Sequence, residues 1–456
     1  MIHVINPATE QRIASYDPHA PAQVGQMLEK ASKAQRSWAL KPIEERAELL
    51  LAIAAVLRRN RAAYARLITR EMGKPITEAE AEIEKSAVTC EFYAKMAPVF
   101  LADISVASNA RDSRVVFDPL GVVLAIMPWN YPFWQFIRFA APALAVGNGA
   151  VLKHANNVPG CALALEQAFK EAGAPDGLVA ALLIEASDVA GVLADKRIAA
   201  VTLTGSTAVG KLVAAQAGRL MKKQVLELGG SDPFIVLADA DVPAAAKAAV
   251  KARFSNTGQS CISSKRFIID ASVADQFVEA FCDAVKALKA GDPEDRGTDI
   301  GPMARENLRD DIHAQVRKSI QQGARLLLGG KPVAGPGYFY EPTVLDHVGP
   351  DMTAATEETF GPVAAIIRAA DTEEAIRIAN ATEFGLGAAL WTSDLAAAET
   401  LARRIEAGAV FVNGMVASDA RLPFGGIKQS GYGRELGEFG IREFTNIKTL
   451  WIGPAR

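Results

Sequence analysis

The segment Val122-Val123-Leu124-Ala125-Ile126-Met127 is a continuous apolar run that follows the turn Pro119-Leu120-Gly121. A run of this length without polar alternation is typical of a strand buried on both faces of a parallel sheet. Further short strands are expected on either side of it, at 114–119, 149–153, 178–184 and 199–203. Helices are expected between and after them, at 134–144, 160–172 and 209–217. This alternation predicts a doubly wound α/β domain.

A second alternating series runs from Phe234 to about Val412. Its expected strands include 233–237, 266–270 and 363–368, and its expected helices 273–290, 305–322, 372–381 and 395–406. Four helices at 24–40, 42–59, 62–72 and 76–96 precede the first series, and strand-like residues at 441–452 leave the globular body at the end. Because 456 residues exceed what one core usually serves, two large domains and a smaller appendage are expected.

Composition excludes several classes of protein. A net charge of −3 and a pI near 6.1 give no electrostatic basis for binding nucleic acid or an anionic membrane. No apolar run reaches membrane-spanning length, and the first residues have no secretory pattern. The cysteines, Cys90, Cys161, Cys261 and Cys282, lack framework spacing and are expected to be free thiols in a reducing cytoplasm. No Cys/His cluster has metal-ligand spacing, so no metal is expected.

One thiol lies in a setting that suits catalysis. Cys261 follows the small and polar residues Asn256-Thr257-Gly258-Gln259-Ser260, where a thiolate can be exposed and stabilised. Upstream, Glu227 precedes Leu228-Gly229-Gly230, where glycine lets the backbone approach a reacting centre. We expect Cys261 to be a nucleophile and Glu227 its base. The alternative is a buried structural cysteine.

The segment Thr204 to Leu212 follows a strand and opens a helix, a position where free backbone amides attract phosphate. It is no Walker loop, because Leu212 stands where Ser or Thr would hold magnesium. It has only two glycines of the dinucleotide fingerprint, Gly205 and Gly210. The alternative is a helix cap formed by Ser206 or Thr207. Lys153 ends a short strand and is either a ribose ligand or simply solvated.

The chain resembles the aldehyde dehydrogenase superfamily through an ordered set of segments that covers nearly its whole length. They are Pro128-Trp129-Asn130-Tyr131-Pro132, Lys153, Gly205 to Gly210, Glu227 to Gly230, Gly258 to Cys261, Glu358-Thr359-Phe360-Gly361-Pro362 and Pro423 to Gly431. The resemblance implies two doubly wound α/β domains and a small β oligomerisation arm. It places the NAD(P)-binding domain at 1–99 and 118–229, the catalytic domain at 230–420, and the arm at 100–117 and 437–456.

The resemblance also implies the chemistry. Cys261 attacks the aldehyde, Asn130 and the Cys261 amide hold the oxyanion, and Glu227 activates water for thioester hydrolysis. The residues implied to bind the cofactor are Trp129, Lys153, Asn156, Gly205, Ser206, Val209, Leu228, Gly229, Glu358 and Phe360. The alternatives are that Trp129 and Phe360 are core aromatics and that Asn130 is a turn residue.

Cofactor choice depends on the position three residues after Lys153. NAD-restricted relatives carry glutamate there, whereas this chain has Asn156. No carboxylate at that position repels a 2′-phosphate, so both NAD and NADP are expected to serve.

Arg138 lies eight residues after Asn130 among apolar neighbours. An arginine there is costly to bury unpaired, and a substrate carboxylate would pair with it. In succinate-semialdehyde dehydrogenases, which this chain resembles most, an arginine at this position contacts the substrate, and Ser418 matches a substrate-facing serine. The alternative for Arg138 is a salt bridge to a protein carboxylate. Those relatives carry a second arginine six residues before the cysteine, where this chain has Ser255.

The expected activity is therefore NAD(P)-dependent oxidation of succinate semialdehyde to succinate. The alternatives are glutarate semialdehyde, betaine aldehyde or an aliphatic aldehyde as substrate, or a catalytically silent relative. The expected assembly is a homodimer or homotetramer, with segments 441–450 and 114–117 pairing across subunits.

Overall fold

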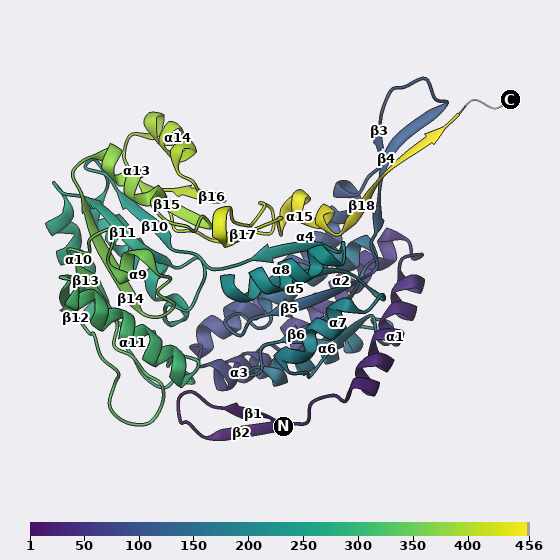
Figure 1. Ribbon diagram of the computed structural model, residues 1–456, viewed down its shortest axis with the longest axis horizontal. Coiled ribbons are helices and arrows are strands. Elements are labelled where there is room, and N and C mark those ends of the chain that lie inside the picture. The colour runs from purple at the N-terminus through teal and green to yellow at the C-terminus, as the bar shows by residue number, and fades with distance from the viewer. Residues whose placement is uncertain (454–456) are drawn as a thin grey trace.

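Two sheets organise residues 1–453, which the computed structural model describes (Figure 1). The first has the order β17-β9-β8-β5-β6-β7. Its strands are β5 (Val122–Met127), β6 (Gly149–His154), β7 (Val179–Ala181), β8 (Ile198–Thr204), β9 (Lys223–Glu227) and β17 (Gly431–Tyr432). All are parallel except β17, which pairs antiparallel with β9. The prediction of a strand over 178–184 was too long, because Leu183 pairs with His19 instead of continuing the sheet.

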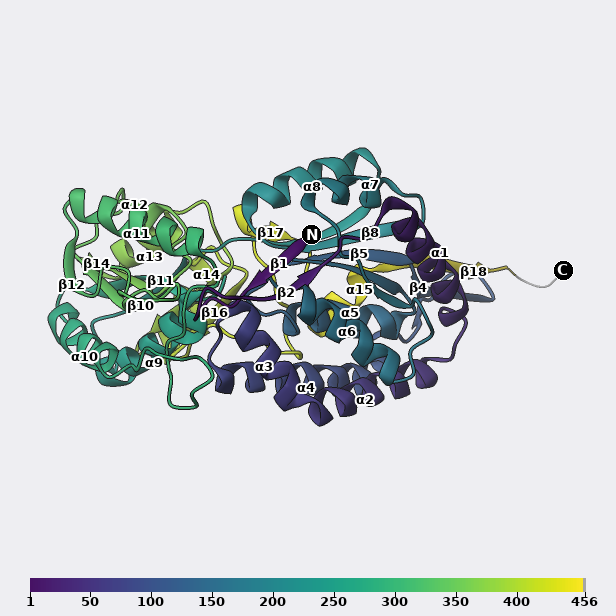
Figure 2. The same cartoon turned by 90° about the horizontal axis from the view of Figure 1, so that it is seen from below.

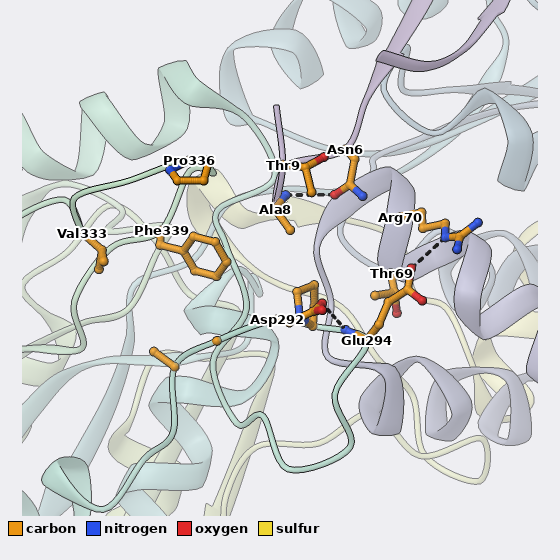
Figure 3. Close-up of a pocket in the computed structure, with 13 residues that line it drawn as sticks. Asn6, Ala8, Thr9, Thr69, Arg70, Asp292, Glu294, Val333, Pro336 and Phe339 are labelled. Carbon is orange, nitrogen blue, oxygen red and sulfur yellow. Dashed lines mark hydrogen bonds and ion pairs between the residues drawn. The ribbon is translucent and has the colours of Figure 1, made fainter. Parts of the chain in front are cut away.

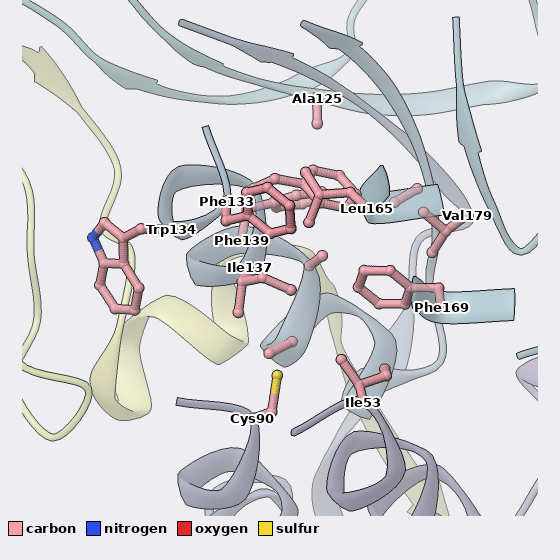
Figure 4. Packing of buried hydrophobic residues seen from close by; sticks show 14 of the residues in the cluster. Ile53, Cys90, Ala125, Phe133, Trp134, Ile137, Phe139, Leu165, Phe169 and Val179 are labelled. Carbon is pink, nitrogen blue, oxygen red and sulfur yellow. The ribbon is translucent and has the colours of Figure 1, made fainter. Parts of the chain in front are cut away.

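Helices cover both faces of this sheet (Figure 2). They are α1 (Pro21–Trp38), α2 (Ile43–Arg59), α3 (Arg61–Met72), α4 (Ile76–Phe100), α5 (Trp134–Val146), α6 (Pro159–Glu171), α7 (Val189–Ala194) and α8 (Thr207–Arg219). Every residue of α5 is buried. A helix that is apolar all round is typical of a position inside a large core. Figure 4 shows its residues Ile137 and Phe139 within that core, together with Ile53 and Cys90 from the outer helices and Phe169 from α6.

The second sheet has the order β12-β13-β14-β11-β10-β15-β16. Its strands are β10 (Asp232–Val236), β11 (Ser264–Asp270), β12 (Arg325–Leu328), β13 (Thr343–Asp346), β14 (Val363–Ala369), β15 (Gly387–Trp391) and β16 (Ala409–Val412). Its helices are α9 (Val242–Phe254), α10 (Ala274–Lys286), α11 (Glu306–Gln321), α12 (Thr353–Thr356), α13 (Thr372–Asn380) and α14 (Leu395–Arg404). One face packs on α9 and α10 and the other on α11 and α13. The doubly wound α/β class is thereby confirmed.

A three-stranded ribbon projects from the body (Figure 1). It consists of β3 (Ile104–Ser105), β4 (Asp112–Pro119) and β18 (Thr445–Ile452). The strand predicted from Ile441 begins only at Thr445, because Gly437–Glu443 form helix α15. The expected pairing of these segments across subunits is corrected too, since β18 pairs with β4 of its own chain, Ile447 opposite Phe117. The last part of the expected arm, 454–456, lies outside the described residues.

Two further features complete the fold. The N-terminal residues form a hairpin of β1 (Ile2–Ile5) and β2 (Arg12–Tyr16), which the sequence did not predict. Among residues 1–453, the helices are all too short or too polar to span a bilayer.

A buried ion pair fixes the start of α5. Lys74 pairs with Glu82 of α4, and both side chains are almost fully buried. The other oxygen of Glu82 accepts hydrogen bonds from the backbone amides of Phe133 and Trp134, at 2.9 and 3.0 Å. Glu82 therefore joins α4 to the loop that carries Asn130.

Replacing Glu82 with Ala should be strongly destabilising, because Lys74 would remain buried without its partner. Breaking such a pair costs about 3–5 kcal/mol. The matched control is Glu80→Ala on the same helix, because Glu80 pairs with the exposed Arg296 and its loss should cost at most about 1 kcal/mol. Denaturant midpoints measure both changes. Equal shifts for the two variants would show that Glu82 is not a fold-defining contact.

Candidate active site

Four strands of the first sheet deliver the expected site residues to one edge. The parallel strands β5, β6, β8 and β9 end at Met127, His154, Thr204 and Glu227. The segments that follow β5, β8 and β9 carry Asn130, Ser206 and Gly229, and Lys153 is the last residue but one of β6. Ligands of open α/β sheets bind at this carboxyl edge.

The turn before Cys261 has an unusual backbone. Asn256, Thr257 and Gly258 have φ values of 54°, 55° and 69°, in the left-handed region. Arg253, at the end of α9, holds this turn from within the protein: its guanidinium donates to the carbonyls of Gly258 and Thr359, at 3.0 and 3.1 Å. Strain of this kind persists only where the surroundings enforce it and is concentrated at functional sites.

Asn130 joins the first sheet to this turn. Its Nδ2 donates to the carbonyl of Gln259 at 3.0 Å, and its own carbonyl accepts from Asn256 Nδ2 at 2.9 Å. Gln135 Nε2 donates to Asn130 Oδ1 at 3.1 Å, which fixes the orientation of the amide. One of the two Nδ2 protons is thus in use and the second is free for an oxyanion.

Cys261 lies between two cavities. The smaller, of about 240 Å³, brings together nine of the expected residues: Trp129, Asn130, Gly205, Ser206, Leu228, Gly229, Cys261, Glu358 and Phe360. Glu358 accepts a hydrogen bond from the Gly230 amide at 3.0 Å, and Trp129 meets Phe360 edge to face. The aromatic pair therefore lines the cavity and also packs against the first core.

The larger cavity, of about 510 Å³, contains Cys261 together with Arg138 and Ser418. Ser255, which stands in place of the second arginine of related enzymes, lines the same cavity. Cys261 and Gln135 line both cavities. The expected nucleophile thus lies at the junction of two binding spaces.

Ser206 acts as the N-cap of α8, with its hydroxyl accepting from the amide of Val209 at 3.4 Å. The capping alternative for this loop is therefore realised. Val209 is about half exposed and lies outside both cavities. The helix N-terminus still faces the smaller cavity through Gly205 and Ser206, where backbone amides favour an anion.

Lys153 and Asn156 lie away from the cavities but contact each other. Lys153 Nζ donates to Asn156 Oδ1 at 2.7 Å, and Asn156 Nδ2 donates to Glu185 at 2.8 Å. Burial lowers the pKa of Lys153, while the nearby Glu185 opposes that shift. A carboxylate is therefore present beside Asn156 after all, supplied by a distant part of the chain.

Glu227 is fully buried at the end of β9 and lines neither cavity. Within residues 1–453 its carboxylate oxygens have no hydrogen-bond partner. Burial, followed by repulsion from Glu435, raises the pKa of Glu227 well above its ordinary value. These surroundings favour the protonated form of the Glu227 carboxyl group as long as the side chain stays in this position.

Arg138 forms a buried ion pair with Glu435. Its guanidinium also donates to Thr204 Oγ1 at 3.3 Å and stacks on the ring of Phe424 at 4.6 Å. The salt-bridge alternative for Arg138 is thus present in the structure, although the side chain still lines the larger cavity.

The surroundings of the thiol disfavour its ionised form. Burial raises the pKa of Cys261 to about 11, and the positive charges of Arg138 and Lys265 oppose this shift. Lys265 Nζ also donates to the Cys261 carbonyl at 2.8 Å, which anchors the residue. An enzyme built on this thiol needs a base or a bound cation to generate the thiolate.

A third cavity, of about 490 Å³, is lined by the turn of the N-terminal hairpin, by α3 and by the loops at 290–294 and 333–339 (Figure 3). Its charged groups are already engaged, since Arg70 pairs with Glu294 at 2.7 Å. It contains none of the expected site residues.

The sequence missed several residues around the site: Lys85, Gln135, Glu185, Arg305 and Glu435. Arg305 lines the smaller cavity and Lys85 the larger one. Only Gln135 left a local signal, because it lies five residues after Asn130. The others come from elements whose position only the fold determines.

The chain is similar over nearly its whole length to proteins of one family. The family model described as "Aldehyde dehydrogenase family" matches residues 1–450. A succinate semialdehyde dehydrogenase [NAD(P)+] of Escherichia coli strain K12 is 50% identical over 447 residues, covering 98% of this chain and 97% of that protein. A succinate-semialdehyde dehydrogenase [NADP(+)] of Mycobacterium avium strain 104 is 48% identical, covering 100% and 97%.

Solved structures give the same result. The succinic semialdehyde dehydrogenase of Streptococcus pyogenes, in complex with NADP+, superposes with a TM-score of 0.97 at 38% identity, covering 100% of both chains. PnpE, in complex with nicotinamide adenine dinucleotide, superposes with a TM-score of 0.96 at 32% identity, covering 99% of this chain and 94% of that one.

The contact between Asn156 and Glu185 yields a prediction about the dinucleotide. If Lys153 marks the ribose site, Glu185→Gln removes a carboxylate that repels a 2′-phosphate. The ratio of kcat/KM for NADP to that for NAD should rise about threefold to fivefold, a value limited by the exposure of Glu185. Steady-state kinetics with both dinucleotides measure this ratio. Asp188→Asn, a neutralisation three residues on, is the control, and an unchanged ratio in Glu185→Gln would separate Glu185 from cofactor choice.

Proposed function

Because this chain belongs to the aldehyde dehydrogenase family, we propose that it oxidises succinate semialdehyde to succinate with NAD or NADP. The observation that carries the proposal is the place of Cys261 at the junction of two cavities. The smaller cavity is suited to the nicotinamide end of a dinucleotide, and the larger cavity contains cationic side chains. The presence of Cys261, Glu227 and Asn130 together argues against a catalytically silent relative.

The residues of the smaller cavity fit a nicotinamide dinucleotide. At Gly229 a Cβ would meet Glu358 Oε2 at 2.5 Å, so a larger residue there would displace the Glu358 carboxylate. The N-terminus of α8 would hold the pyrophosphate, Glu358 the nicotinamide ribose and Lys153 the adenosine ribose. When bound, NAD(P) accepts the hydride.

The first step belongs to Cys261. The thiol first gives its proton to water in the cavity, its Sγ then forms a bond with the aldehyde carbon, and the carbonyl electron pair moves to oxygen to give a thiohemiacetal anion. The free Nδ2 proton of Asn130 and the Cys261 amide are placed to hold that oxygen, as preorganised donors do in acyl transfer. Lys265 keeps the Cys261 backbone in position during the attack.

The second step belongs to Glu227. After oxidation the substrate is a thioester on Cys261, and water must attack its carbonyl carbon. Glu227 takes a proton from that water, the carbon–sulfur bond breaks, and succinate leaves with the thiolate restored. Because Glu227 lines neither cavity, its side chain turns toward Cys261 for this step.

The substrate carboxylate needs a positive environment, and the larger cavity supplies one. Arg138 and Ser418 lie on its wall, as the resemblance to succinate-semialdehyde dehydrogenases implies. Since Arg138 already pairs with Glu435, we assign it a shared role, in which it contributes to the potential of the cavity and also orients Glu435.

Assembly and compartment form part of the proposal. The projecting ribbon exposes apolar side chains, among them Ile447 and Trp451, which supports a homodimer or homotetramer built through this arm. The four cysteines are free, which supports the cytoplasm, where thiols remain reduced.

An aldehyde panel tests the activity. Succinate semialdehyde should give a kcat/KM at least about tenfold above that for butanal, which has the same chain length but no carboxylate. Cys261→Ala should abolish turnover with every aldehyde and leave dinucleotide binding unchanged, as fluorescence titration would show. A preference for butanal would overturn the substrate, and turnover by the Ala variant would overturn the nucleophile.

Glu227→Gln should separate the two steps. The amide has the shape of the carboxyl group but cannot accept a proton, so reduced cofactor should appear in a burst of about one equivalent per subunit and then stall. Stopped-flow absorbance measures the burst. Equal loss of the burst and of the steady rate would assign Glu227 to an earlier step.

A further inference from the structure

Lys85 is a cation of the larger cavity that the mechanism above does not use. It lies on α4, and its Nζ donates to Ser418 Oγ at 2.6 Å. The same Nζ stands 4.3 Å from the ring of Trp134. Ser418, Trp134 and Cys261 all line the cavity with it. An ammonium group has three donors and Ser418 takes one of them, so at least one remains for a ligand.

The cavity presents two other cations, and each differs from Lys85. Arg138 is committed to Glu435, and the side chains of this pair are 3% and 4% exposed. Moving Arg138 to a substrate would leave Glu435 buried without a partner, which is strongly unfavourable. Lys251 is exposed to solvent, where water competes for its charge.

Lys85 differs from Arg138 in its ion pairing. No carboxylate of residues 1–453 forms an ion pair with it. The nearest acidic group along the 418 loop, Asp419, is held by Arg421 at 2.6 Å. Burial, followed by repulsion from Arg138, lowers the pKa of Lys85 to about 8. The carboxylates of Glu82 and Asp419 oppose this shift, but each forms its ion pair with another residue, so Lys85 is partly desolvated and has a donor left for an anionic ligand.

We propose that Lys85, together with Ser418, binds the carboxylate of the substrate and so determines the preference for ω-carboxylated aldehydes. This inference rests on the proposed oxidation of succinate semialdehyde and adds the residue that selects it. The carboxylate takes the free N–H of Lys85 and the hydroxyl proton of Ser418, while the aldehyde carbon reaches Cys261 in the same cavity. Lys85 replaces, from a different helix, the charge that related enzymes draw from the position of Ser255.

The test compares Lys85→Met with Lys251→Met, the same substitution at the exposed cation of the same cavity. Lys85→Met should lower kcat/KM for succinate semialdehyde about 10- to 100-fold, mainly through KM, as loss of a charge-assisted hydrogen bond requires. Butanal turnover should change by less than about twofold, and Lys85→Arg should restore part of the loss. Lys251→Met should stay within about threefold of the wild type for both substrates.

Each outcome bears on one of the two proposals. Equal loss with both aldehydes, or no loss with either, would overturn the role of Lys85 while the wild-type preference for succinate semialdehyde stands. A wild-type enzyme that does not prefer succinate semialdehyde to butanal would overturn the proposed substrate. NADP binding, measured for every variant by fluorescence titration, distinguishes a selective loss from misfolding. If Lys85→Met does not bind NADP, Lys85→Gln replaces it, and the same ratio of the two substrates decides.

Discussion

The reciprocal hydrogen bonds between Asn130 and the turn before Cys261 are the contacts on which the site depends. They join a loop of the first sheet to a turn that leads into the second. The turn keeps its shape only because Asn256 and Thr257 remain in a left-handed conformation. Since Gln259 accepts from Asn130 and Cys261 follows two residues later, the thiol and the side-chain amide of Asn130 are held close to each other. Precise placement of this kind accounts for much of the rate of a covalent enzyme.

Buried cations stabilise the backbone around Cys261 mainly by donating hydrogen bonds to its carbonyl groups, and less by pairing with carboxylates. Arg253 donates to the carbonyls of Ser264 and Gly258, and Lys265 donates to those of Ser260 and Cys261. A charged donor strengthens each hydrogen bond. Such contacts fix main-chain positions regardless of the neighbouring side chains. The loops on either side of the thiol are therefore rigid at the point where chemistry requires it.

The sequence predicted the parts of the fold and the site that depend on local pattern. The run at 122–127 is a buried strand because its residues are apolar on both faces, and Cys261 was recognisable from the small polar residues before it. A salt bridge of Arg138 was one alternative, but its partner Glu435 could not be identified, because the contact depends on the return of the chain to the first sheet at β17. Lys85 resembled any surface lysine of an amphipathic helix until Trp134 and Ser418 were placed beside it. Glu185 was missed for the same reason, since its contact with Asn156 is not local.

The charged groups around Glu227 determine whether its carboxyl group can accept a proton. Glu227 and Glu435 share one nearby cation, Arg138, and Glu435 holds it in an ion pair. Repulsion from Glu435 and burial both favour the protonated form of Glu227, and a protonated carboxyl group is no base. We therefore expect Glu227 to act as a base only after it turns toward the water beside Cys261, where solvation favours its charge. Gly425 leaves room for the carboxylate in its resting position, because a Cβ there would meet Glu227 Oε1 at 2.7 Å. The absence of a hydrogen-bond partner for Glu227 within residues 1–453 means that the turn breaks no contact of this kind.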